Sequence, residues 1–549
     1  MSTTMGLSRR ATAAIFAALV LFYGLTLPGN TIEAIDGYDY ALAAETIPLA
    51  NSHDTRSILF HKINRVIYLT AAKVVPGVRA YTVLRWQSIL VAAGALLLFA
   101  RLMMVGFSLT ATAAWTGAAL LGASYGFWRY ALEVEVYAPS TFLILATLNL
   151  IVDAENRDPN GHYGLVPAGV FGGFAALYYQ PIAIALFLAA PVLLLSRRTF
   201  WRFAAYGASA TLVVLTGLCL AYTFRESAPL SISTLLAFIN DRGDEFPAPA
   251  VSLWSFGQGG LAVAHDLIST HWLYGFDSVT RWLEQRIPGR FYHFEETIYA
   301  AQHAPWLVQL APLALAAFLV TAAMVGAAAW RGRSRIKHLR LFLFMIAWFI
   351  LHGIFTIKLD PSTEEAWIIA ITPLIALLTV GVIAPTCAAG GQRYTFAAAA
   401  LLLILNYAAG IGLYRDGANE RRRIAMAYLE ANAKPGDVLV SSSLENDDWV
   451  HARYRLGLGV ISIDGDKART WRVDPHANIF GTADAMLRSV HERGGRIFAL
   501  ERAFSPGDRL AVREGEIAAK AAQIFAAQWR SRATVVATGP FGRTYQIVP

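Results

Sequence analysis

The sequence is poor in charge and in cysteine. Only 15% of its 549 residues are charged and 56% are hydrophobic, whereas about a quarter of a soluble globular protein is charged. The mean hydropathy is +0.45, so the bilayer is the expected solvent, and disordered or coiled-coil proteins are excluded. The two cysteines, Cys219 and Cys387, each lie in or beside an apolar block. This excludes a cysteine zinc cluster and argues against a structural disulfide.

The apolar residues come in long blocks. A spanning helix needs roughly 20 of them, and about eleven blocks of that kind occur. They are residues 11–27, 82–100, 108–126, 137–152, 164–179, 181–195, 203–223, 306–329, 341–357, 367–385 and 395–414. We therefore predict a mostly α polytopic membrane protein of about 11 transmembrane helices. The first block lacks a small-x-small cleavage site, which favours a retained signal anchor over a cleaved signal peptide.

Basic residues orient the predicted spans. With a cytoplasmic N-terminus, the short basic connections all fall inside, as the positive-inside rule requires. These connections hold Arg9, Arg10, Arg101, Arg157, Arg197, Arg198, Arg202, a cluster at 331–340 and Arg393. Loops 28–80 and 224–305 and everything after Arg415 then lie outside. The formal charge of +8 is thus explained by topology, and no nucleic-acid partner is expected.

The two outer loops are not plain linkers. Residues 38–47 and 57–75 show helical apolar spacing and predict two short helices along the membrane surface. The second loop is rich in tryptophan and tyrosine, which is typical of an interfacial belt or of the lining of a site for a greasy ligand. We assign 1–414 to the membrane domain and 415–549 to an extracytoplasmic domain.

After Arg415 the composition becomes that of a globular domain. Strands are predicted at 438–442, 459–463, 496–500, 533–538 and 544–548, and helices at 419–433, 483–493 and 514–529. Alternating strands and helices predict a small α/β domain. It contains no Gly-x-Gly-x-x-Gly turn, no Walker loop and no His/Cys metal spacing. Asp447 and Asp448 are interpreted as part of a solvated loop.

Two acidic clusters follow the first and the third apolar blocks. One is Glu33-Ala-Ile-Asp36-Gly-Tyr-Asp39, and the other is Glu133-Val-Glu135. Ionisable groups near membrane depth are costly, so they are functional candidates where they face a cavity. Acids from different loops on one side of the membrane suit general-base or metal chemistry. The alternatives are that Asp36 only caps a helix and that the two glutamates only complement a helix dipole.

A third acidic cluster and a set of cations complete the outer face. Asp360, Glu364 and Glu365 lie in a short late loop that covers residues 358–367, for which a solvated turn is the plainer reading. The cations are His53, Arg56, His61, Lys62, Arg65 and Arg85. They are candidates for holding a phosphate at the membrane surface. For Arg85, at the outer end of a span, snorkelling to the interface is the alternative.

Together these features resemble the GT-C superfamily of integral-membrane glycosyltransferases. Its members use polyprenyl-phosphate-linked sugars and include the protein mannosyltransferases and lipid A aminoarabinose transferases. The resemblance is carried by the acids after the first span, the run His61-Lys-Ile-Asn-Arg65, Arg85 at the start of the next span and Glu135-Val-Tyr137. A His-rich turn often joins the fifth and sixth spans in the bacterial branch. Here Tyr178-Tyr-Gln180-Pro181 takes its place.

The resemblance implies an inverting sugar transfer. Asp36 would act as general base on the acceptor hydroxyl, with Glu135 and Asp39 orienting the acceptor or a divalent cation such as Mg or Mn. Arg85 and Lys62 would bind the leaving phosphate. The other implied substrate-binding residues are His61, Tyr137, Tyr179 and Gln180.

The implied partners and location follow from the same resemblance. The donor would be a polyprenyl-phosphate-linked sugar, and the acceptor a glycolipid, a polysaccharide or a protein. The protein would lie in the bacterial inner membrane, among membrane lipids, with its C-terminal domain in the periplasm. A transporter or flippase is the first rival, although no repeated halves are visible. A scaffold acting through its C-terminal domain is the second.

Overall fold

The chain forms two compact units in the computed structural model, and each is described by itself. The structure describes residues 8–31, 36–49, 57–157, 163–194, 200–225, 229–240, 251–286, 291–332, 338–359, 361, 364–441, 446–462, 479–504, 523 and 525–548. The helical unit comprises Met1–Leu27, Tyr40–Thr270 and Gln309–Gly412, and the sheet unit comprises Pro28–Asp39, His271–Val308 and Leu413–Pro549.

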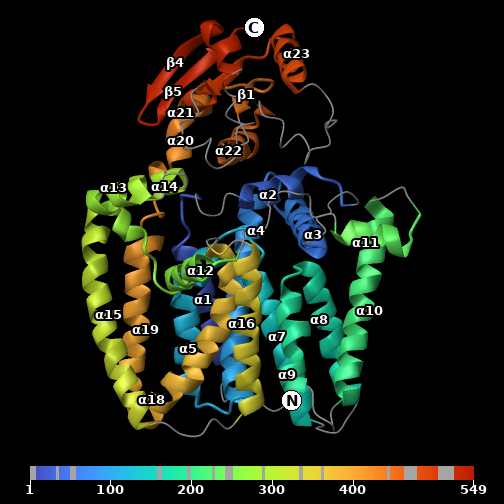
Figure 1. Ribbon diagram of the computed structural model, residues 1–549, viewed down its shortest axis with the longest axis vertical. Helices are drawn as coiled ribbons and strands as arrows, with labels where there is room; N and C mark the ends of the chain where they lie inside the picture. The colour runs from blue at the N-terminus through green and yellow to red at the C-terminus, as the bar shows by residue number, and fades with distance from the viewer. Residues whose placement is uncertain are drawn as a thin grey trace. The chain divides into compact units, whose positions relative to one another are not determined.

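The helical unit is built from long apolar helices (Figure 1). Its main helices are α1 (Arg9–Leu25), α3 (Ile58–Val74), α4 (Ala80–Arg101), α5 (Ala111–Ala123), α6 (Tyr125–Ala131), α7 (Tyr137–Arg157), α8 (Val166–Tyr178), α9 (Ala190–Leu194), α10 (Phe200–Arg225), α11 (Ile232–Asn240), α12 (Leu253–Leu267), α16 (Leu339–Leu359), α17 (Ile368–Leu378), α18 (Ala384–Ala388) and α19 (Gln392–Asn406). Two helices also hold residues of the sheet unit, namely α2 (Asp36–Thr46) and α15 (Pro305–Arg331).

The prediction of a polytopic helical protein is confirmed. Every predicted apolar block coincides with helix, and among the described residues seven helices are long and apolar enough to cross a membrane. The other blocks form shorter helices. For example, α1 has 17 residues and α5 has 13, and α5 ends because Ser124 is extended, with φ −62° and ψ 138°. The count of about eleven spans stays a prediction.

Small residues let the helices of this unit approach closely. A Cβ added to Gly169 of α8 would come 2.4 Å from the carbonyl oxygen of Tyr206 in α10, and one added to Gly117 of α5 would come 2.3 Å from the Thr379 hydroxyl. In lipid there is no hydrophobic force between helices, so close backbone packing of this kind holds them together.

The sheet unit contains a five-stranded mixed sheet of order β2-β1-β3-β5-β4 (Figure 1). The strands are β1 (Val438–Ser441), β2 (Gly459–Ser462), β3 (Ile497–Leu500), β4 (Ala533–Gly539) and β5 (Gly542–Ile547). Strand β1 pairs with β2 and β3 in parallel, and β5 pairs antiparallel with β3 and β4. All five predicted strands and the α/β class are confirmed, with ends shifted by one or two residues.

The helices of this unit differ more from the prediction. They are α13 (Asp277–Arg286), α14 (Phe291–Gln302), α20 (Arg421–Ala425), α21 (Ala427–Asn432), α22 (Asn446–Leu456), α23 (Ile479–Glu492) and α24 (Glu501–Phe504). The single helix predicted over 419–433 is wrong, because the chain breaks at Met426 (φ −99°, ψ 7°). The loop predicted at Asp447 and Asp448 is also wrong, since both lie in the first turn of α22. Most of the helix predicted over 514–529 lies outside the described residues.

The inner strands of the sheet bury both of their faces. Val438, Val440 and Ile497 pack in one apolar cluster with Phe525 and Trp529. The alternate residues of the same strands, including Leu439 and Phe498, pack in a second cluster with Met426 and Leu429. Parallel strands covered on both faces are expected to be apolar at every position, as these are.

The described residues of the segment 28–39 belong to the sheet unit. The Gly29 amide donates to the Tyr414 carbonyl at 3.1 Å, and the Thr31 hydroxyl donates to Glu420 at 2.9 Å. Only glycine fits at position 29, because a Cβ there would come 2.5 Å from the Gly417 nitrogen. The connection that follows the first apolar helix is therefore fixed to the start of the C-terminal region.

Candidate active site

The connection between α6 and α7 holds a wholly buried carboxylate. Glu133 has 0% exposure. It forms an ion pair with Arg129, one helical turn earlier and equally buried, and it accepts a hydrogen bond from the Tyr81 hydroxyl at 2.5 Å. A buried charge is tolerated only when it is paired and hydrogen-bonded in this way. These contacts fix the backbone that carries the next acid, Glu135.

Arg85 fastens the same connection to α4. Its Nε donates to the Leu132 carbonyl at 2.7 Å and lies 3.7 Å from Oε2 of Glu133. Its guanidinium also lies 5.2 Å from the centre of the Tyr81 ring. The structure therefore shows a positioning contact for Arg85, and its predicted role as a phosphate ligand stays a prediction.

Glu135, Tyr137 and Tyr179, which were predicted separately from the sequence, lie together. Glu135 is 2% exposed, and the Tyr137 and Tyr179 rings are 6.0 Å apart between centres. The Tyr137 hydroxyl donates to Oε2 of Glu365 at 3.1 Å. Glu365, Tyr179, Glu135 and Tyr40 all act electrostatically on that hydroxyl. The cluster brings together the start of α7, the helical turn Glu364–Trp367 that precedes α17, and the residue that follows α8.

An aromatic wall adjoins this cluster. The Tyr40 ring lies 4.9 Å from Phe60 and 5.6 Å from His61, between centres, and Phe60 lies 5.6 Å from Tyr178. His61 is thus placed on α3 with its ring against Tyr40. Gln180 follows α8 in a tight turn in which its carbonyl accepts from the Ala183 amide at 2.9 Å. Flat rings beside carboxylates are suited to binding a sugar, which has both apolar C–H faces and hydroxyls.

The cations of α3 contact the preceding segment. The Lys62 ammonium donates to the Leu49 carbonyl at 2.9 Å, and partial burial lowers the pKa of Lys62. Arg65 donates to the Ala44 carbonyl near the end of α2. Lys62 has three N–H donors, so a phosphate oxygen can be bound in addition to the carbonyl.

Asp36 and Asp39 occupy the first turn of α2 within the sheet unit. Asp36 is exposed and Asp39 is half-buried. Tyr38 between them is 4% exposed, and its ring stacks on Tyr454 of α22 at 5.2 Å between centres. The buried tyrosine fixes the turn that carries both carboxylates. Their predicted joint action with Glu135 stays a prediction, and Glu33, His53, Arg56 and Asp360 lie outside the described residues.

A histidine–carboxylate pair was missed from the sequence. Nε2 of His265 lies 3.2 Å from Oε2 of Glu364, and Nδ1 of His265 accepts from the Thr270 amide at 3.2 Å. The second contact places the ring proton on Nε2, facing the carboxylate. Glu364 and Glu365 looked like a solvated turn because their partners, His265 and Tyr137, are far away in sequence. Only the aromatic-rich composition around His265 signalled this region.

Among the described residues, the side chains grouped closely enough to hold a metal ion include His265 and Glu364. The predicted Mg or Mn ligand Glu135 acts electrostatically on Tyr137 together with Glu365, and its role in binding a cation stays a prediction. His265 with Glu364 is a mixed nitrogen and oxygen pair, which suits a transition metal. The residues present therefore fit a divalent cation, and they do not require one.

The chain shares its fold with solved polytopic membrane proteins. It is similar to ArnT from Cupriavidus metallidurans in the apo state, with a TM-score of 0.50, 11% identity and 98% of each chain covered. Also similar are ArnT from Cupriavidus metallidurans bound to undecaprenyl phosphate (TM-score 0.45, 10% identity, 98% of this chain and 99% of that one) and the Archaeoglobus fulgidus oligosaccharyltransferase tethered with an acceptor peptide (TM-score 0.46, 11% identity, 99% and 74%).

These comparisons bear on the fold, and its assignment rests on the apo structure of ArnT. No protein-family model matches the chain, and no curated protein matches its sequence. The predicted GT-C fold is confirmed.

Proposed function

We propose that the protein is an integral-membrane glycosyltransferase that moves a hexosyl or pentosyl group from a polyprenyl-phosphate donor to an acceptor hydroxyl, with inversion. The observation that carries the proposal is the cluster of the buried Glu135 and Tyr137 with the half-buried Tyr179 and Glu365 in a chain with the GT-C fold. The donor class comes from the sequence resemblance. The same resemblance and the basic loops support placement in a bacterial inner membrane, with the sheet unit in the periplasm.

The chemistry requires a base, an orienting group and a cation for the leaving phosphate. Asp36 takes the proton of the acceptor hydroxyl, whose oxygen attacks the anomeric carbon. The bond from that carbon to the donor phosphate oxygen breaks, and polyprenyl phosphate leaves with the electron pair. Glu135 and Tyr137 orient the hydroxyls of the bound sugar or acceptor, and Lys62 with Arg85 stabilises the charge on the leaving phosphate.

A divalent cation on Asp36, Asp39 or Glu135 would add a further positive charge beside the phosphate. The chain's own residues supply the carboxylate that takes up the proton. They also supply the aromatic rings and the cations that bind the substrates.

Asp36→Asn tests the base. Purified wild type and Asp36→Asn are compared in transfer of sugar from a polyprenyl-phosphate donor extracted from the native membrane. The expected rate loss is about 10²–10⁴-fold, because the general base is removed, with unchanged thermal stability because Asp36 is exposed. The matched control is Asp277→Asn, which removes another exposed acid from the first turn of a helix in the same unit.

Two results would contradict the proposal. Full transfer activity in Asp36→Asn, with the control also active, would overturn the assignment of the base and leave a helix-capping role. Transport of a labelled lipid by both proteins with no transfer product would instead favour a flippase.

A further inference from the structure

A pair of side-chain amides joins α3 to α4 in the helical unit. Nε2 of Gln87 on α4 donates a hydrogen bond to Oδ1 of Asn64 on α3 at 3.3 Å. Asn64 is 2% exposed, and Gln87 is half-buried. Each amide group carries both donors and an acceptor, so this one bond uses the acceptor of Asn64 and the donor of Gln87.

The other half of each amide is buried without a partner. Among the residues that the structure describes, neither Nδ2 of Asn64 nor Oε1 of Gln87 forms a hydrogen bond, although both atoms are shielded from solvent. Turning both amides over exchanges the bonded and the unbonded atoms and leaves the same imbalance. Buried polar atoms are nearly always hydrogen-bonded, because an unpaired one has lost water and gained nothing. The pair therefore presents one donor and one acceptor to a further group.

A third unbonded group lies nearby on the buried face of α3. The Tyr178 hydroxyl at the end of α8 is buried and has no hydrogen-bond partner in the described part of the chain. The Tyr178 ring packs edge-on against Phe60, at 5.6 Å between centres. Phe60 and Asn64 are buried residues of α3, and residues four apart are neighbours on a helix. The unbonded groups thus extend from the contact of α3 and α4 towards the aromatic wall of the candidate site.

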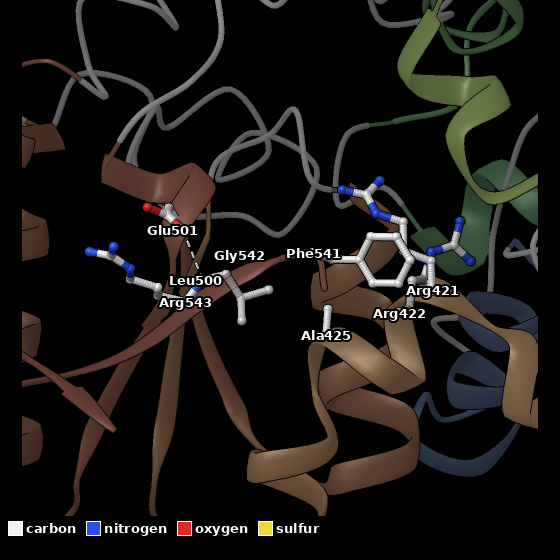
Figure 2. A pocket seen from close by; sticks show the side chains of 8 residues that line it. All are labelled: Arg421, Arg422, Ala425, Leu500, Glu501, Phe541, Gly542 and Arg543. Carbon is white, nitrogen blue, oxygen red and sulfur yellow. Dashed lines mark hydrogen bonds between the residues drawn. The ribbon is translucent and has the colours of Figure 1, made fainter. Parts of the chain in front are cut away.

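A recess in the sheet unit shows the opposite case. It lies between α20, α24 and the hairpin of β4 and β5. Figure 2 shows Glu501, whose Oε2 accepts from the Arg543 amide at 2.9 Å, and Arg421, whose guanidinium lies 5.2 Å from the centre of the Phe541 ring. These contacts fix the hairpin to α24 and α20, so the packing of the unit explains them. The unbonded atoms of Asn64 and Gln87 have no such explanation.

The chemistry of the two unbonded atoms selects their ligand. An apolar chain leaves both of them unpaired. An ionised phosphate oxygen only accepts hydrogen bonds, so it meets Nδ2 of Asn64 but leaves Oε1 of Gln87 unpaired. A hydroxyl both donates and accepts, so it meets both atoms at once. A buried water has the same ability, and the experiment below separates it from a hydroxyl of the substrate.

We propose that Asn64 and Gln87 bind a hydroxyl of the sugar that the polyprenyl-phosphate donor carries. Asn64 donates to the hydroxyl oxygen, and Gln87 accepts from the hydroxyl proton, so a sugar that lacks this hydroxyl binds less tightly. The donor is favoured over the acceptor because the same two helices carry Lys62 and Arg85, the cations proposed for the donor phosphate. The inference rests on the proposed function and adds to it the residues that select the sugar.

The experiment compares two lipids on the full chain in detergent. One is the polyprenyl-phosphate sugar donor extracted from the native membrane, and the other is polyprenyl phosphate without a sugar. The Kd of each is measured by tryptophan fluorescence for wild type and Asn64→Leu, which keeps a similar volume without polar atoms. Asn64→Leu is expected to raise the Kd of the donor at least about tenfold and to leave that of polyprenyl phosphate unchanged. Gln309→Leu, the control, removes an exposed amide of the same unit and should change neither.

The double variant Asn64→Leu/Gln87→Leu guards against misfolding. Asn64→Leu alone leaves the whole Gln87 amide without its partner, whereas the double variant removes both amides together. Replacing both partners of a hydrogen bond by apolar groups of similar shape is nearly neutral for stability. The melting temperature should therefore stay close to that of wild type, while the Kd of the donor rises as it does in the single variant.

The other results contradict the inference in distinguishable ways. If both variants bind the donor as tightly as wild type does, the pair holds a water or no ligand, and the inference is overturned. An equal rise in the Kd of the two lipids would place the phosphate or the chain at the pair, which also overturns it. If wild type binds neither lipid, the proposed function is wrong and the inference fails with it.

Discussion

Glu133 of the helical unit and Glu420 of the sheet unit are both buried completely among arginines. Glu133 pairs with Arg129 four residues away and with Tyr81 and Arg85 of the neighbouring α4. Glu420 accepts from Thr31, which is 389 residues distant, and lies 3.6 Å from Arg455.

The contacts of the two glutamates stabilise different parts of the structure. The Glu133 contacts are local and orient one connection beside the aromatic cluster, whereas the Glu420 contacts join segments from opposite ends of the chain. Burial raises the pKa of Glu420 in spite of the attraction of Arg422 and Arg455, so its neutral form is tolerated better than that of an ordinary surface glutamate. Replacing each acid by its neutral isostere should therefore have unequal effects.

Glu133→Gln should be the most damaging change. It leaves Arg129, which is 0% exposed, without its counterion, and breaking a buried pair from one side costs about 3–5 kcal/mol. A large fall in melting temperature in detergent is the expected measurement. Glu492→Gln, an exposed glutamate in α23, should change stability by less than about 0.5 kcal/mol. If Glu133→Gln were as stable as this control, Glu133 would not hold the connection between α6 and α7 in position.

His451 should make the sheet unit sensitive to acid. It is wholly buried, and burial, followed by the charges of Arg455 and Arg422, lowers its pKa from 6.5 to about 3. Between these values only the unfolded chain takes up the proton, so stability falls as the pH drops from 6.5 towards 3, by up to about 1.4 kcal/mol per pH unit.

His451→Gln removes this titration, and the melting temperature should then fall less between pH 6.5 and 4.5. His491→Gln, which changes an exposed histidine of the same unit, should keep the wild-type slope. Identical slopes in all three proteins would show that His451 does not control the acid response.

Glu420→Gln should have the smallest effect of the three. The amide keeps an oxygen for the Thr31 hydroxyl and resembles the neutral form of the acid that burial favours, so the expected loss is about 1 kcal/mol. Chemical denaturation of wild type, Glu420→Gln and Glu133→Gln gives the comparison directly. If Glu420→Gln were as damaging as Glu133→Gln, the two buried sites would be equivalent, and the contrast drawn between them would be wrong.

The fold class could be predicted from the sequence because it depends on local patterns of apolar residues. Long apolar blocks became helices, and the five strands lie where short β-branched runs occur. The helix over 419–433 failed at Met426 because that residue packs in the same cluster as Leu439 and Phe498 of the sheet. Tertiary packing of this kind overrides a regular helical pattern.

The candidate site was accessible only in part. Glu135 and Tyr137 stand out in sequence as polar groups at the start of an apolar block, and the structure brings Tyr179 to them. The sequence alone does not show that Glu365 belongs to this site, because its contact with Tyr137 spans 228 residues. A pair of acids in a short turn carries no local sign of such a partner, so their role is set by the fold alone.

The chain alternates between the two units, and this has a consequence for its biosynthesis. The chain passes from one unit to the other after residues 27, 39, 270, 308 and 412. Thr31 leaves the ribosome 389 residues before its partner Glu420, a delay of about 20–80 s at ~5–20 residues per second. Residues 413–548 are synthesised after the other segments of the sheet unit, so Gly29 and Thr31 can contact Tyr414 and Glu420 only once that region has left the ribosome. A shortened chain that ends before the sheet would leave Tyr38 and Gly29 without the surfaces on which they rest.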